Sequence, residues 1–89
     1  MPLLLVTFDP NKLGRDYSNL RDKIKSYSNV RLSESSYAII TDETPDIVCE
    51  VLKKHIDTDD NIYIINLKRP YAGYGSKLVT DWLKKELRD

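Results

Sequence analysis

The chain has 89 residues, 40% of them apolar and 31% charged, so it suffices for one domain and is too short for two hydrophobic cores. Fourteen basic side chains balance fourteen acidic ones, which argues against a strongly basic nucleic-acid-binding protein. The single cysteine, Cys49, excludes an internal disulfide and a zinc site built on cysteines. The opening apolar run, residues 3–6, is too short for a signal peptide or a membrane span, so we expect a cytoplasmic protein without a membrane partner.

The first half of the chain predicts three strands and one helix. A continuous apolar run over residues 3–8 stops at the turn cluster Asp9-Pro10-Asn11, as strands do. An amphipathic helix is then expected from Asp16 to a stop at Asn29, because apolar side chains recur every three or four residues at Tyr17, Leu20, Ile24 and Tyr27. Two short strands, at 30–34 and 36–41, follow this helix.

The second half predicts a helix, a strand and a further helix. Thr44 and Pro45 indicate a helix start, since threonine caps helices and proline suits the first helical position. A strand at 62–67 completes the order β-α-β-β-α-β, which predicts an α+β, ferredoxin-like sandwich. After a loop, Ser76 is placed to cap an additional C-terminal helix. We therefore expect one domain over residues 1–89, with a core at about 3–67 and a C-terminal loop and helix at 68–89.

Three of the expected strands are apolar on both faces, at residues 3–6, 37–40 and 62–65. A ferredoxin-like sheet carries its two helices on one face, so strands with an open second face should alternate apolar and polar residues. Something must therefore cover the second face. The candidates are a second copy of the chain and the C-terminal helix, and we expect a homodimer.

Four segments resemble the SinR-like small proteins of bacteria and phages, and this resemblance covers nearly the whole chain. The segments are LLLVTFDPNKLGRDYSNL, SESSYAIITDETPDIV, HIDTDDNIYIINL and YAGYGSKLVTDWLKKEL. These proteins are in turn similar to the CRISPR-associated Cas-two family, over about residues 3–67, through the strand that ends in Asp9 and the segment Ser35-Ser36-Tyr37. The second similarity implies a ferredoxin-like homodimer associated with RNA or DNA, in some cases a nuclease that depends on Mg²⁺ or Mn²⁺.

The same resemblance implies that Asp9 is the catalytic, metal-binding carboxylate. An aspartate at a strand end suits Mg²⁺, because this ion is commonly held by one or two carboxylates with water and phosphate completing the octahedron. In a symmetric dimer, two Asp9 side chains can converge across the axis. The alternative is that Asp9 opens the Asp-Pro-Asn turn by bonding its own backbone.

Basic residues gather in residues 12–31, where six of them face two acidic ones. The candidate nucleic-acid-binding residues are these cations and two serines from the resembling segment: Lys12, Arg15, Arg21, Lys23, Lys25, Arg31, Ser35 and Ser36. The alternatives are a solvated charged surface and, for the serines, a bend between strands. Tyr71 and Tyr74 lie beside basic residues in a glycine-containing loop, where they either stack on single-stranded bases or pack the last helix onto the sheet.

Three functions stay open on this sequence. The first is a nucleic-acid-associated homodimer of the Cas-two kind, with weak metal-dependent nuclease activity or with none. The second is a non-catalytic structural or protein-interaction module, such as a phage or toxin–antitoxin accessory protein, and the third is a small-ligand sensor. The neutral net charge predicts that any nucleic-acid binding is weak and falls steeply with salt.

Overall fold

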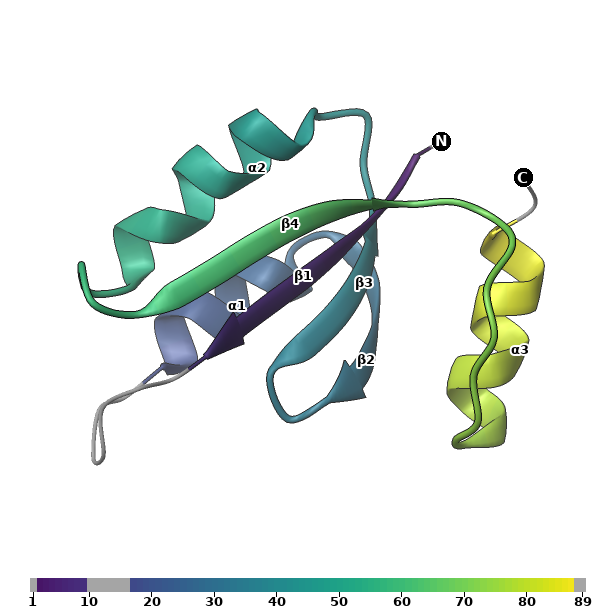
Figure 1. Cartoon of the computed structure of the whole chain (residues 1–89). Coiled ribbons are helices and arrows are strands. Elements are labelled where there is room, and N and C mark those ends of the chain that lie inside the picture. Colours follow the sequence, from purple (N-terminus) through teal and green to yellow (C-terminus); the bar gives the residue numbers. More distant parts are fainter. Residues whose placement is uncertain (1, 10–16, 88–89) are drawn as a thin grey trace.

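A computed structural model of the chain describes residues 2–9 and 17–87, which form a small α+β domain (Figure 1). Four strands build one antiparallel sheet in the order β2-β3-β1-β4: β1 (Leu3–Asp9), β2 (Ser28–Ser33), β3 (Ser36–Ile40) and β4 (Asn61–Leu67). The helices are α1 (Ser18–Lys25), α2 (Pro45–Leu52), which continues into the 3₁₀ turn η1 (Lys53–His55), and α3 (Lys77–Glu86). Within the described ranges, no helix is both long and apolar enough to cross a membrane.

Two predicted helix starts are confirmed by side-chain caps. The Thr44 hydroxyl accepts a hydrogen bond from the Ile47 amide at 3.4 Å, and Pro45 is the first residue of α2. The Ser76 hydroxyl accepts a hydrogen bond from the Val79 amide at 3.4 Å, and Ser76 is the N-cap of α3. Each cap satisfies one of the backbone donors that a helix leaves unpaired in its first turn.

The predicted end of the first helix is wrong by four residues. The helix stops at Lys25, and Asn29 already lies in β2. The cause is local competition for backbone groups. The Ser26 hydroxyl donates to the Lys23 carbonyl at 2.6 Å, and the side-chain amide of Asn29 donates to the Tyr27 carbonyl at 2.9 Å. Serine and asparagine side chains offer the backbone such partners outside a helix. The expected start at Asp16 lies outside the described residues.

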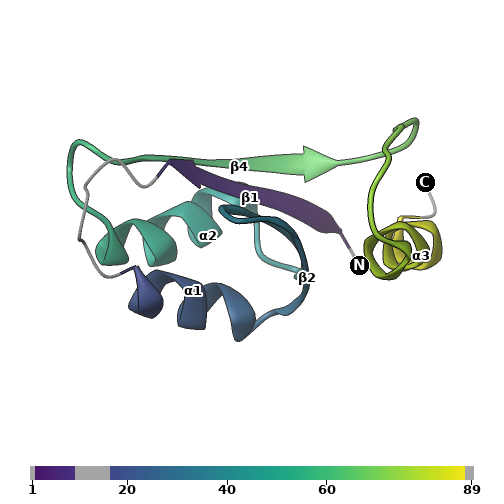
Figure 2. The same cartoon turned by 90° about the horizontal axis from the view of Figure 1, so that it is seen from below.

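Helices α1 and α2 lie side by side on one face of the sheet (Figure 2). The hydrophobic core fills the space between this face and the two helices. It draws on both helices and on the central strands, and its most buried members include Leu4, Val6, Leu20, Ile24, Tyr37, Ile39, Val48 and Leu52. Buried and less buried side chains alternate along β1 because every second side chain of a strand points to the same face.

The outer face of the sheet, turned away from α1 and α2, is only half covered. One row of side chains crosses this face in register, from Val30 through Ala38 and Leu5 to Ile65. Val30 and Ala38 are buried, Leu5 is half-buried, and Ile65 is 50% exposed. Helix α3 packs against β2, at the buried end of the row (Figure 1). The predicted C-terminal helix therefore covers the β2 side of the outer face and leaves the β4 side open.

Tyr27 and Glu43 provide a pH-sensitive contact beside the core. The Tyr27 hydroxyl donates to the Glu43 carboxylate at 2.8 Å. Burial, together with this hydrogen bond and the negative charge of Glu43, raises the pKa of Tyr27 to about 12. An unfolded tyrosine loses its proton near pH 10. Between these two values the unfolded chain binds fewer protons than the folded chain, so stability falls as pH rises.

We therefore expect Tyr27→Phe to lower the free energy of unfolding by about 1 kcal/mol at pH 8, a modest amount because the pair is only partly buried. The difference between the wild type and the variant should vanish as the pH rises from about 10 to about 12. Urea denaturation of both proteins across this range measures it. A difference that stays constant with pH would show that the hydrogen bond does not set the titration of Tyr27.

Candidate functional site

Asp9 lies at the C-terminal end of β1, on the outer face of the sheet. Its cross-strand partner is Asn61, the first residue of β4. Both side chains are exposed and line a shallow hollow together with Thr7, Phe8 and Tyr63. Asp9 is therefore accessible to an ion or a phosphate group, and it shares a face with the exposed side chains of β4.

The donors around Asp9 in one chain are a partial set for a metal ion. Asp9 offers one carboxylate and Asn61 one amide oxygen. Among the residues that the structure describes, no group of three or more histidine, cysteine, aspartate or glutamate side chains could hold a metal. Mg²⁺ keeps several waters and is bound through one or two protein carboxylates, so Asp9 and Asn61 fit part of its coordination shell.

Arg21 and Arg31, two of the predicted nucleic-acid-binding residues, converge on the turn between β2 and β3. Both donate to the Glu34 carbonyl oxygen, Arg21 at 3.3 Å and Arg31 at 2.9 Å. Their guanidinium groups also lie 3.8 and 3.7 Å from the Glu34 carboxylate. Each stacks on a ring of the sheet, Arg21 over Phe8 at 5.5 Å and Arg31 over Tyr37 at 5.7 Å. The two arginines thus hold the turn, and Glu34 offsets part of their charge.

Two further predicted cations that the structure describes, Lys23 and Lys25, do not join this cluster. Lys23 and Lys25 are exposed in the last turn of α1, where positive charge complements the helix dipole. Lys12 and Arg15 lie outside the described residues. Of the four predicted cations that the structure describes, two therefore come together, and they do so around a carboxylate.

The two predicted serines occupy different environments. Ser35 lies in the turn between β2 and β3, and its carbonyl oxygen accepts a hydrogen bond from the Phe8 amide at 3.0 Å. Ser36 begins β3, and its hydroxyl lies 3.1 Å from the Thr7 hydroxyl on the outer face. Ser36 is therefore on the same face as Asp9, whereas the backbone of Ser35 fastens the turn to β1.

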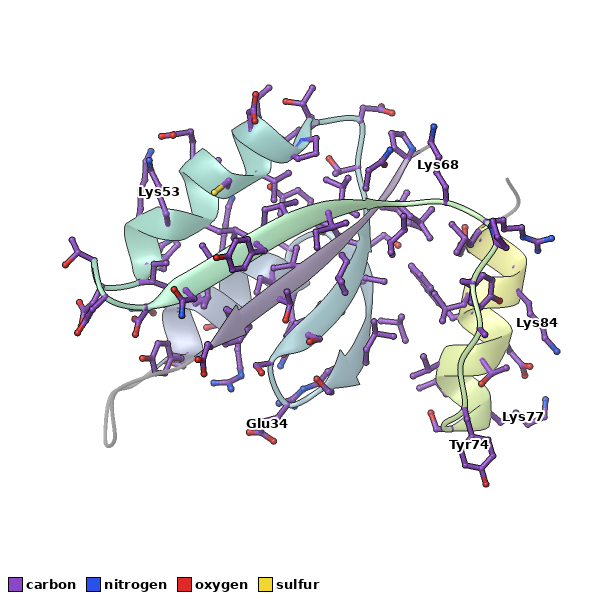
Figure 3. The ribbon with its side chains drawn as sticks, in the orientation of Figure 1. Glu34, Lys53, Lys68, Tyr74, Lys77 and Lys84 are labelled. Carbon is purple, nitrogen blue, oxygen red and sulfur yellow. The ribbon has the colours of Figure 1, made fainter. Side chains whose placement is uncertain are left out.

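Tyr71 and Tyr74 belong to the segment that joins β4 to α3. Tyr74 is fully exposed, and Tyr71 is 40% exposed. In Figure 3 the Tyr74 ring projects from the tip of this segment, away from the sheet. Of the two interpretations from the sequence, packing of α3 onto the sheet does not apply to Tyr74. The Tyr74 ring is free to stack on the ring of a bound ligand, such as a base.

No family model, no curated protein and no solved structure matches this chain. The description of the site therefore depends on the geometry of the described residues. Sequence reasoning missed the arrangement of Arg21 and Arg31 around Glu34. The spacing of Arg31 and Glu34 is a local signal for their pairing, whereas Arg21 reaches the turn from α1 and only the fold brings it there.

Two substitutions test which contacts stabilise the turn between β2 and β3. We expect Glu34→Gln to change the free energy of unfolding by less than about 0.5 kcal/mol, because exposed ion pairs contribute little and the carbonyl contacts persist. Arg31→Gln should cost about 1 kcal/mol or more, since it loses bonds to the carbonyls of Ser33 and Glu34 and the stack on Tyr37. Urea denaturation measures both. Equal losses would mean that the ion pairs, not the carbonyl contacts, fasten the turn.

Proposed function

We propose that the protein is a ferredoxin-like homodimer that associates with nucleic acid. The strand order β2-β3-β1-β4, with β1 and β3 at the centre, supports the ferredoxin-like assignment, and so does the placement of α1 and α2 on one face. Helix α3 is an addition to this core. The fold alone carries no activity, since the same arrangement serves many functions.

The observation that carries the dimer is the β4 patch, which consists of Leu5, Tyr63 and Ile65 on the outer face. Tyr63 is 63% exposed and Ile65 is 50% exposed, although both lie in the middle of a strand. Large apolar side chains gathered on one face of a monomer mark an interaction surface. A second copy of the chain is the natural occupant, because two-fold packing lets one patch cover the same patch on its partner.

The association with nucleic acid is supported by the resemblance to the Cas-two family and by the position of Asp9. Asp9 borders the β4 patch on the same face, so a dimer formed through this patch has both Asp9 side chains along one interface. The two carboxylates and the Asn61 amides are the residues that would hold Mg²⁺ or Mn²⁺. Such an ion would supply a Lewis acid for phosphodiester cleavage. The neutral net charge keeps the binding weak and salt-sensitive.

The dimer interface is tested by placing a charge in the β4 patch. We expect Ile65→Asp to raise the dimer dissociation constant by at least about 30-fold, because an isologous interface buries the unpaired carboxylate twice. Ile47→Asp is the matched control, since Ile47 is 49% exposed on α2, on the opposite side of the sheet. Sedimentation velocity over a concentration series measures both. A control as dissociated as Ile65→Asp, or an Ile65→Asp protein that remains dimeric, would contradict this interface.

The proposed catalysis is tested on single-stranded RNA and duplex DNA, with and without Mg²⁺ or Mn²⁺. We expect slow cleavage that needs the metal and that Asp9→Asn reduces to background. Asp42→Asn is the control. Asp42 is exposed and follows Ile40, the last residue of β3, which pairs with Leu3 at the opposite end of β1 from Asp9. Equal cleavage by wild type and Asp9→Asn would indicate a contaminating nuclease. No cleavage by wild type would remove the catalytic role and leave a binding module.

A further inference from the structure

The segment 68–76, called here the arm, runs back alongside α3 (Figures 1 and 2). The arm contacts α3 near its start and leads directly into the helix at its end. Near the start of the arm, the Arg69 guanidinium donates to the Leu87 carbonyl, at the C-terminal end of α3. At the end of the arm, the Ser76 hydroxyl caps the N-terminus through the Val79 amide. The arm therefore runs antiparallel to α3 and is tied to the far end of the helix through Arg69.

A groove of about 420 Å³ lies between β2 and the arm with α3. The arm contributes Tyr71 and Tyr74, and β2 contributes Arg31 and Leu32. A volume of this size falls in the range of small-ligand sites. Tyr74 lines the groove while its ring stays fully exposed, so a flat ring can approach it without displacing a protein side chain.

Among the residues that the structure describes, one cation, Arg31, lines the groove, two more line the hollow beside it, and no carboxylate lines either. Residues 68–87 hold five cations and two carboxylates: Lys68, Arg69, Lys77, Lys84 and Lys85 against Asp81 and Glu86. Lys84 and Arg69 line an adjoining hollow that shares Tyr71 with the groove. Lys77 and Lys84 project from the side of α3 that faces away from the sheet (Figure 3). Lys77 is paired with Asp81 at 2.6 Å, which leaves Lys84 as the stronger electrostatic contribution on this side.

We propose that this groove binds single-stranded nucleic acid, with a base stacked on Tyr74 and Tyr71 and the phosphate backbone directed along Arg31 and Lys84. The inference builds on the proposed association with nucleic acid and names the strand state and the site. Aromatic rings flanked by cations are the usual components of single-strand binding, because every base has a face that can stack. A base-paired duplex hides those faces. The three cations along the groove and the adjoining hollow, Arg31, Arg69 and Lys84, also favour a polyanion over a neutral proline-rich peptide, the other class of ligand that tyrosine-lined grooves hold.

The test is fluorescence anisotropy with a labelled oligothymidine of about 12 nucleotides and with a duplex of the same length, between about 50 and 200 mM salt. We expect Tyr74→Ala to weaken single-strand binding by about 5- to 150-fold, while Tyr74→Phe, which keeps the ring, binds like wild type. Lys84→Gln should lower the slope of log affinity against log salt by about 0.7. Lys54→Gln, an exposed lysine in η1, is its matched control and should leave the slope unchanged.

The outcomes separate this site from the broader proposal. If wild type binds the oligonucleotide and Tyr74→Ala binds equally well, nucleic-acid association stands and the groove is not the site. If wild type binds neither probe at low salt, both proposals fall. Preference for the duplex over the single strand overturns the stacking site, as does tight binding of a proline-rich peptide in place of the oligonucleotide. Because Tyr74 is fully exposed, circular dichroism should show that its variants fold like wild type.

Discussion

The rest of this structure depends on one constraint, which is that the sheet carries apolar side chains on both faces while one chain covers only one face completely. Helices α1 and α2 bury Leu4, Val6 and Tyr37 on the inner face. On the outer face, α3 reaches the β2 side and stops. The β4 patch stays exposed, and removal of its apolar surface from water would drive the proposed dimer.

Much of the fold could be predicted from local sequence signals. The caps at Thr44 and Ser76 act on amides three residues away, so sequence spacing is enough to find them. The end of α1 could not, because Ser26 and Asn29 compete with the helix through contacts that propensity leaves open. The candidate site was harder to predict from the sequence than the fold. The apolar pattern of β4 shows that both faces need cover, yet only the cross-strand register shows that Ile65 lacks it.

The two proposed surfaces lie at opposite edges of the sheet and are compatible with each other. Strand β4 forms one edge and carries the dimer patch, whereas β2 forms the other edge and borders the groove. A dimer formed through the β4 patch leaves Tyr74 and Lys84 of each copy accessible. Two grooves on one particle would also raise the avidity for a longer strand, which matters for a neutral protein whose individual contacts are weak.

The central claim is that two copies meet through the β4 patch, and an isotope-filtered nuclear Overhauser experiment on mixed labelled and unlabelled protein tests it most directly. The account predicts intermolecular contacts from the Ile65 methyl groups to the Tyr63 ring protons, and none from the equally exposed Ile47 on α2. Intermolecular contacts centred on α1 or α2, or a protein that stays monomeric at the concentration of the experiment, would contradict it.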